Sequence, residues 1–190
     1  MARMGLTAER VVEAAADLAD EIGFDNVTLS ALARGFGVKD ASLYSHVKNL
    51  QDLRERVALL AGSELTDRTG AALAGRAGKD ALVAFADAYR KFAHERPGRY
   101  AATQIRLDQA LAASSPAFLR NAENCYAMLR AYGLAEPDLT DAVRLLRSTF
   151  HGFVSLEAAG GFGAARLPRE SWDRVVEALH SALEHWPSPS

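Results

Sequence analysis

The sequence is short of the features that mark several common classes of protein. It holds one cysteine, Cys125, in 190 residues, so no disulfide forms within the chain, and a lone thiol suits a reducing compartment. No apolar run reaches the length of about 18 residues that a membrane-spanning helix needs. The first residues lack the apolar stretch and cleavage site of a secretory signal. We therefore expect a cytoplasmic protein without a membrane partner.

Clustered metal ligands and phosphate-binding loops are also missing from the sequence. The histidines never stand three or four residues apart, the spacing that places two metal ligands on one helical face. The glycine-rich stretch at 160–163 does not follow an expected strand, so it does not match a nucleotide-binding loop. These absences predict that the protein is not an enzyme and holds no metal or cofactor.

The net charge gives little sign of a nucleic-acid partner. The chain has 22 Lys and Arg against 24 Asp and Glu, a formal net charge of −2, whereas DNA-binding domains are usually basic. Acidic residues gather between Glu9 and Glu21, however, while Lys39, His46 and Lys48 lie close together further along. The local arrangement of charge is therefore more informative than the total.

The segment from residue 28 to residue 53 has the pattern of two short helices around a glycine turn. Apolar residues recur at helical spacing over 29–36, and Thr28 precedes them as a cap for the first turn. Gly37 provides a residue at which a left-handed backbone costs little, so the first helix should end there. A second short helix is expected over about 39–47. This pattern predicts a helix-turn-helix.

The outward face of that second helix predicts a contact with DNA. Its small residues can lie close to a major groove while longer polar side chains reach phosphates. Lys39 can donate to guanine and Asp40 can accept from cytosine, and Ala41 or Ser45 can meet a thymine methyl. Two alternatives remain open: Asp40 as an acid that stabilises the helix start, and Tyr44 as a packing aromatic. The candidate DNA-binding residues are Thr28, Lys39, Asp40, Ala41, Ser42, Tyr44, Ser45, His46 and Lys48.

This pattern resembles the DNA-binding domain of the tetracycline-repressor (TetR) family over roughly the first 60 residues. In that family the residue after the cap at Asn49 is often a lysine that grips phosphate, whereas here it is Leu50. The resemblance implies a helix-turn-helix DNA-binding domain over 1–50 and a helical effector-binding and dimerisation domain over 51–190. The matching positions are Gly23-Phe24, Thr28, Leu32-Ala33, Gly37-Val38, Leu43-Tyr44, His46-Val47, Asn49 and Leu53.

Helical periodicity and its interruptions continue through the rest of the chain. A first helix over about 7–23 should bury a stripe that runs from Val11 to Ile22. Asn49, with Asp52 three residues later, resembles a capping box and starts a helix that the stretch 70–78 interrupts. No strand-like alternation competes, so we expect an all-α fold. The later helices are expected at about 80–96, 99–111, 116–132, from beyond Pro137-Asp138 to Ala159, and 170–186.

The segment from Phe150 to Phe162 partly resembles the His-Gly motif of one type of TetR-family C-terminal domain. His151-Gly152 can be a place where helices pack closely or the polar wall of a ligand pocket. Aromatic and polar residues mixed along the preceding helices predict an effector cavity, although each aromatic can equally belong to the core. The candidate ligand-binding residues are Tyr89, Phe92, Tyr100, Gln104, Phe118, Tyr126, Met128, Leu129, Phe150 and His151.

The last two helices carry apolar stripes that predict a dimer. Two such helices from each subunit would form the four-helix interface usual in the TetR family, and a monomer would leave much of that surface in water. The candidate interface residues are Leu145, Thr149, Phe153 and Leu156 on one helix and Trp172, Val176, Leu179 and Leu183 on the other.

Together these features predict an all-α homodimeric transcriptional regulator with double-stranded operator DNA and a small-molecule effector as partners. We expect a repressor that the effector releases from a palindromic operator. An activator of the same fold is one alternative. A helical protein-binding adaptor is another, but it gives no reason for the polar ridge that runs from Tyr44 through His46 to Lys48.

Overall fold

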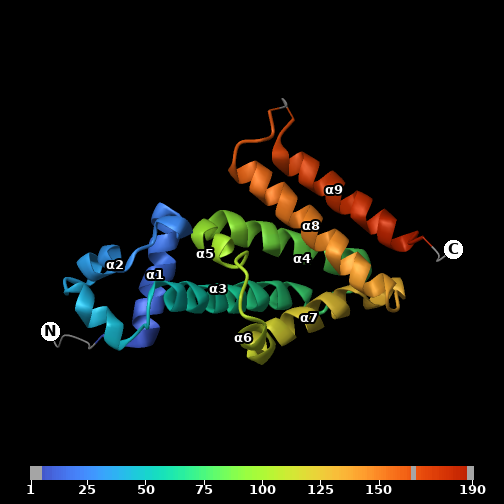
Figure 1. The fold of residues 1–190 in the computed structure, drawn as a ribbon. Coiled ribbons are helices and arrows are strands. Elements are labelled where there is room, and N and C mark those ends of the chain that lie inside the picture. Colours follow the sequence, from blue (N-terminus) through green and yellow to red (C-terminus); the bar gives the residue numbers. More distant parts are fainter. Residues whose placement is uncertain (1–5, 164–165, 188–190) are drawn as a thin grey trace. The chain divides into compact units, whose positions relative to one another are not determined.

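The computed structural model describes residues 6–163 and 166–187, and every regular element in these ranges is a helix. The prediction of an all-α fold is confirmed. Three of the elements are short 3₁₀ helices: η1 (Phe24–Asn26), η2 (Asp40–Ser45) and η3 (Arg130–Tyr132). The α-helices, labelled in Figure 1, are α1 (Ala8–Ile22), α2 (Leu29–Phe36), α3 (Leu50–Leu73), α4 (Gly78–Glu95), α5 (Pro97–Ala102), α6 (Gln109–Ser114), α7 (Pro116–Leu129), α8 (Asp138–Ala158) and α9 (Pro168–Glu184).

The chain forms two compact units. The N-terminal unit extends to Leu65 and also contains Glu95–Phe118, whereas the C-terminal unit consists of Thr66–His94 and the chain from Leu119 onward. Helix α3 passes through Leu65 and therefore contributes to both units. Helix α5, far along the chain, belongs to the N-terminal unit because it packs against α1.

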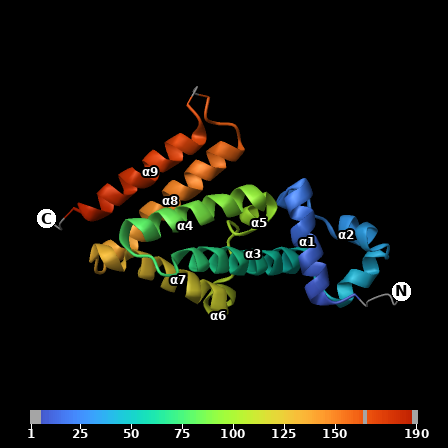
Figure 2. The same ribbon diagram turned by 180° about the vertical axis from the view of Figure 1, so that it is seen from behind.

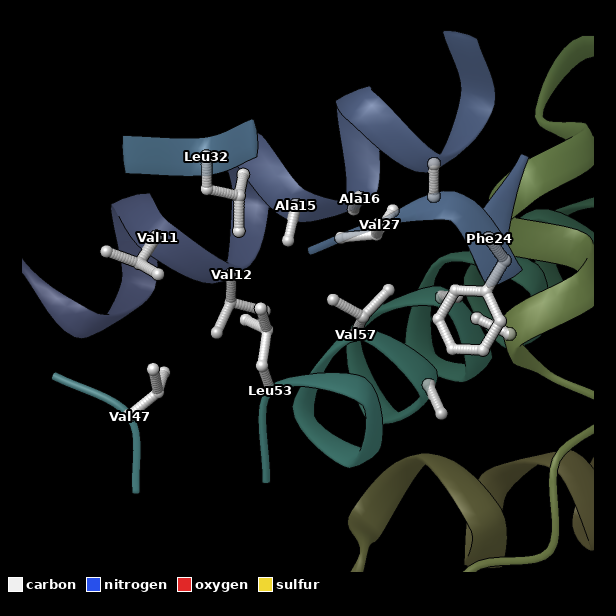
Figure 3. Close-up of a cluster of buried hydrophobic side chains, with 14 of the residues drawn as sticks. Val11, Val12, Ala15, Ala16, Phe24, Val27, Leu32, Val47, Leu53 and Val57 are labelled. Carbon is white, nitrogen blue, oxygen red and sulfur yellow. The ribbon is translucent and has the colours of Figure 1, made fainter. Parts of the chain in front are cut away.

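The N-terminal unit is held by one apolar core to which α1, α2, η2 and α3 all contribute. Val11, Leu32 and Val57 come from three different helices and turn their side chains toward the same interior in Figure 3. Full burial of each such side chain is worth about 1.5–3 kcal/mol. One expected member differs: Ile22 is 41% exposed. Helix α1 ends at Gly23, and η1 brings Phe24 into the core instead.

The helix starts and stops of this unit follow the expected local chemistry. The Thr28 hydroxyl oxygen accepts a hydrogen bond from the Ala31 N–H at 3.1 Å. Gly37 ends α2 with a left-handed backbone at φ 66°. The Asn49 side-chain oxygen accepts from the Asp52 N–H at 2.8 Å and thereby caps α3. These three predictions from sequence are confirmed.

Three predicted helices differ in the structure. The second helix of the helix-turn-helix is the 3₁₀ helix η2. The helix expected over 99–111 is divided into α5 and α6, and the Asp108 carboxylate caps α6 by accepting from the Ala110 and Leu111 N–H groups. Helix α3 continues through Gly70 to Leu73. A Cβ on Gly70 would lie 2.9 Å from the Asn124 amide nitrogen, so glycine serves close packing there.

The C-terminal unit is built from α4, α7, α8, α9 and the end of α3. Helices α8 and α9 run side by side and antiparallel in both views (Figures 1 and 2). Phe150 of α8 lies at the centre of an aromatic cluster, with its ring centroid 5.7 Å from that of Tyr89 and 5.5 Å from that of Trp172. None of the described helices is both long and apolar enough to span a membrane.

Candidate functional site

Helix η2 presents a surface of small and polar side chains. Leu43 of η2 and Val47, two residues beyond its end, are 0% and 2% exposed and anchor the element in the core of the N-terminal unit. Val47 is labelled among the core side chains in Figure 3. Ala41 and Ser42 face solvent, and Tyr44 is 57% exposed. The element therefore has one face fixed by packing and an opposite face accessible to a partner.

Two of the candidate residues on this surface also hold the local fold together. The Ser30 hydroxyl of α2 donates to the Asp40 carboxylate, so Asp40 links the two arms of the helix-turn-helix. The Ser45 hydroxyl donates to the carbonyl oxygen of Ser42 at 2.8 Å. Thr28 caps α2, as described above. Lys39, at the start of η2, and Lys48, just beyond its end, are exposed.

The segment that follows η2 is bonded to the first turns of α3. The Asp52 carboxylate accepts from the Lys48 N–H at 2.9 Å and from the Arg56 Nε at 3.0 Å. Arg56 also donates from Nη1 to the His46 carbonyl oxygen at 3.2 Å. Burial acts to raise the pKa of Asp52, but the bonds from Lys48 and Arg56 outweigh it and hold that pKa below its usual value.

A buried arginine on α5 holds the acidic face of α1. Arg99 is 2% exposed, and its guanidinium bonds Asp20, Asp17 at 3.0 Å and Glu13 at 2.9 Å. Its Nε also lies 3.3 Å from a carboxylate oxygen of Glu64 on α3. Burial alone would lower the pKa of Arg99, but its bonds to Asp20 and Asp17 raise that pKa above the usual value.

The candidate ligand-binding residues divide between the two units. Tyr100, Gln104 and Phe118 lie in the N-terminal unit, and the other seven lie in the C-terminal unit. Phe92, Met128, Leu129 and Phe150 are at most 2% exposed, and Tyr89 and Tyr100 are each 8% exposed. Phe118 and Tyr126 are 42% and 44% exposed, while Gln104 and His151 are half-buried.

The core around these residues contains a polar cluster that bridges α4 and α8. Both Glu157 carboxylate oxygens accept from the Arg90 guanidinium, and His94 lies 2.8 Å from one of them. The Arg90 bond is the main reason that the pKa of Glu157 lies below its usual value, against the opposing effect of burial. The same guanidinium lies 5.9 Å from the ring centroid of Trp172.

The expected dimer residues fall into two groups. On α9, Trp172, Val176, Leu179 and Leu183 are 0–7% exposed within the single chain. This corrects the expectation that a monomer leaves the stripe in water, because α4 and α8 of the same subunit already contact it: Trp172 donates to Asp87 of α4 at 3.0 Å and packs on Phe153 of α8. Phe153 is also buried.

The outward face of α8 keeps three of its four predicted residues, whereas the outward face of α9 differs from the predicted one. On α8, Leu145 and Leu156 are 36% and 52% exposed, and Thr149 lies between them at helical spacing. A Cβ built on Gly152 would meet no other heavy atom within 4 Å in the described ranges. On α9 the residues one position before the buried stripe are Ser171 and Val175, which are half-buried, and Ala178 and Ala182, which are exposed.

Comparison with known proteins identifies the family of this chain. Residues 11–57 match the sequence profile described as "Bacterial regulatory proteins, tetR family", and residues 82–179 match "Tetracyclin repressor-like, C-terminal domain". The second match alone covers more than half of the 190 residues. The chain belongs to the TetR family.

Two curated relatives support this placement of the TetR-family chain. An uncharacterised helix-turn-helix transcriptional regulator of Mycobacterium tuberculosis is 38% identical over 82% of this chain and 72% of its own length. Another, YobS of Bacillus subtilis, is 35% identical over 95% of this chain and 94% of its own length. The chain is thus a DNA-binding transcriptional regulator of this family and not an enzyme.

A solved structure shows the same fold. A protein of unknown function from Rhodococcus sp. RHA1 superposes with a TM-score of 0.77 at 21% identity, over 96% of this chain and 98% of that one. The shared fold therefore extends over nearly the whole chain.

Two arginines that hold the N-terminal unit together were not predicted from the sequence. Arg56 was not singled out, although its spacing of four residues from Asp52 is the usual spacing of an ion pair on a helix. Arg99 bonds residues 79 to 86 positions away in the sequence. No pattern among neighbouring residues of this sequence indicates such a distant contact.

Proposed function

We propose that this chain acts as a homodimeric repressor in the cytoplasm and leaves a palindromic operator when a small organic effector binds. The observation that carries the DNA-binding part is the exposed surface of η2, anchored by Leu43 and Val47 and bordered by Lys39 and Lys48. Small residues at its centre permit close approach to base edges, and the lysines reach phosphates.

The dimer part rests on the outward face of α8 and α9. A glycine in the middle of a helix costs roughly 0.5–1 kcal/mol relative to alanine, and Gly152 has no close neighbour in its own described chain to account for it. A helix of a second subunit can approach closely at that position, with Leu145 and Leu156 on either side. Two-fold symmetry makes such a face its own partner.

The effector part rests on the aromatic composition of the C-terminal unit. Tyr89, Phe92, Phe150 and their neighbours give apolar walls suited to an organic molecule. Helix α3 contributes residues to both units, so a displacement of its C-terminal part changes the position of its N-terminal part. The effector must bind the DNA-incompatible state more tightly for this to release the operator.

Dimer geometry then controls affinity for the operator. Two η2 elements must reach successive major grooves, which lie about 34–36 Å apart for half-sites one turn apart. The proposal is tested by selecting duplexes from a random-sequence pool with the purified protein. A two-fold symmetric consensus, bound by two subunits, supports it, and a protein that enriches no duplex contradicts it.

Repression and activation share all of this geometry, so transcription itself has to be measured. Transcription in vitro from a promoter that overlaps the selected sequence should fall when the protein is added. Transcription should recover when a compound that raises the thermal unfolding temperature of the protein is added. A rise in transcription on adding the protein would instead indicate an activator.

A further inference from the structure

Asp52 and Arg56 form a ring of hydrogen bonds with His46 and Lys48, the first and third residues after η2. Asp52 accepts from the Lys48 N–H, and Arg56 donates to the His46 carbonyl oxygen. The Asp52 and Arg56 side chains are joined at 3.0 Å and are 20% and 36% exposed. The ring therefore encloses the backbone from His46 to Lys48 and fastens it to α3.

The two enclosed backbone groups have few other ways of being satisfied. The His46 carbonyl stands at the C-terminal end of η2, where helical carbonyls lack partners within the helix. The Lys48 N–H lies two residues before the start of α3. Each receives a charged partner from α3, and hydrogen bonds to charged groups are stronger than those between neutral groups.

The ring connects the segment 46–48 with α3, and these two regions have different proposed roles. On one side are His46 and Lys48, candidates for contact with DNA phosphates. On the other is α3, the helix whose displacement we propose to release the operator. Val47, between the two enclosed groups, is 2% exposed and fixes the segment in the core. Hydrogen bonds to His46 and Lys48 and the burial of Val47 thus fix the same three residues.

We propose that Asp52 and Arg56 are positioning residues for DNA recognition, which hold η2 and the segment 46–48 rigidly on α3. Movement of α3 then carries the recognition surface with it and is not absorbed by the connecting segment. This inference rests on the proposed function, because it takes η2 as the surface that meets the operator.

A direct phosphate contact by Arg56 is the competing explanation. Two of its nitrogens already bond Asp52 and His46, and the Asp52 carboxylate balances its charge. A neutral pair releases few counterions on binding DNA, whereas an unpaired lysine or arginine contributes about 0.9 to the log–log salt slope. The two explanations therefore differ in salt dependence.

The experiment uses the full chain and a duplex that the wild-type protein selects from a random pool. Affinity for that duplex and for a scrambled duplex is measured over a series of salt concentrations. The variants are Arg56→Gln, Arg56→Lys and the double variant Asp52→Asn/Arg56→Gln, which removes the ion pair without leaving an unpaired charge. Gln51→Ala is the matched control, because it removes another four-residue hydrogen bond of α3, from Gln51 to Glu55 at 2.8 Å, that does not involve the segment 46–48.

We expect Arg56→Gln to weaken binding to the selected duplex on the order of tenfold, the effect of one hydrogen bond to a charged group. The salt slope and the binding to the scrambled duplex should stay at the wild-type values in the double variant, because the pair that it removes is neutral. Arg56→Lys should not restore affinity, because one ammonium cannot bridge both acceptors. Gln51→Ala should behave as wild type.

Three results would overturn the inference. One is an unchanged affinity in Arg56→Gln. The second is a salt slope lowered by about one in the double variant, as expected for Lys48→Ala. The third is wild-type affinity in Arg56→Lys. Either the second or the third result would make Arg56 a phosphate contact. A wild-type protein that selects no duplex would overturn the proposed function itself, and the inference with it.

A second measurement does not depend on DNA. Hydrogen exchange of the Lys48 amide should accelerate in Asp52→Ala and remain at the wild-type rate in Gln51→Ala, while circular dichroism confirms that both variants are folded. An unchanged exchange rate in folded Asp52→Ala would show that the ring does not hold the segment.

Discussion

Gly98 of α5 lies so close to Ala19 of α1 that a Cβ on Gly98 would come within 2.0 Å of the Ala19 carbonyl carbon and oxygen. Both atoms belong to the backbone, so no side-chain rotation can relieve the contact. The two helices can meet at this distance only because residue 98 is glycine. Arg99, the next residue, then holds the carboxylates on the same face of α1.

Gly98→Ala should therefore separate α5 from α1. We expect a loss of at least about 2 kcal/mol in the free energy of unfolding, in line with overpacked cores, measured by denaturant unfolding followed by circular dichroism. Gly35→Ala is the control: Gly35 lies in α2, and its added Cβ meets no described atom within 4 Å. That change should stabilise by roughly 0.5–1 kcal/mol, and equal effects would contradict the steric argument.

Arg99→Leu should be more destabilising than the loss of a surface ion pair. It leaves Asp20, whose side chain is 11% exposed, without its main counter-charge, and breaking a buried pair in this way costs about 3–5 kcal/mol. Arg144→Leu removes an ion pair with Asp141 whose side chains are 76% and 57% exposed, and should cost no more than about 1 kcal/mol. Similar unfolding midpoints for the two variants would argue against the buried network.

Lys39→Ala distinguishes base reading from phosphate binding. Loss of a contact to one guanine should cost roughly 1–3 kcal/mol of binding free energy at one position of the operator and relax the preference there. Affinities for a set of single-base operator variants provide the measurement. A uniform loss over all variants would make Lys39 a phosphate contact only.

The dimer proposal predicts opposite behaviour for two leucines of the last helices. Leu156 is 52% exposed and Leu179 is 7% exposed. Leu156→Glu should leave the subunit folded but monomeric, because the charge meets only the partner. Leu179→Glu should unfold the C-terminal unit, because it leaves a carboxylate in the core of its own subunit. Sedimentation with circular dichroism separates these outcomes, and a dimeric Leu156→Glu would exclude the α8 face.

Glu157 gives the C-terminal unit an acid-sensitive contact. Its pKa is lowered from the ordinary 4.5 chiefly by the Arg90 hydrogen bond. A lowered folded-state pKa means that the contact stabilises the fold above pH 4.5 and that this contribution falls as the pH drops through the folded-state value. The stability difference between wild type and Glu157→Gln should therefore shrink below pH 4.5. Parallel stability curves down to roughly pH 3 would contradict this.

Local chemistry explains which features could be predicted from the sequence. Thr28, Gly37 and Asn49 act on groups within four residues, so each cap or stop could be predicted from adjacent residues. Asp108 acts in the same way, and a search for caps would have divided the helix expected over 99–111. The exposed surface of η2 followed from periodicity, because Leu43 and Val47 fix its inward side.

Long-range packing explains the rest. Helical spacing identifies an apolar stripe but does not distinguish a stripe that faces its own subunit from one that faces a partner. The stripe containing Trp172 and Leu179 is large and apolar, and it is buried within its own C-terminal unit. The outward residues Ala178 and Ala182 have too little apolar area to be predicted as an interface from the sequence. Likewise, only the tertiary structure brings Arg99 to α1.

The position of Trp172 allows the C-terminal unit to be followed by intrinsic tryptophan fluorescence. The chain has two tryptophans, Trp172 and Trp186, and both belong to the C-terminal unit. Trp172 is fully buried, bonded to Asp87 and packed against Phe150 and Phe153. Indole fluorescence of the unmodified protein therefore reports on the proposed effector unit alone, and candidate effectors can be screened by titration without attaching a dye.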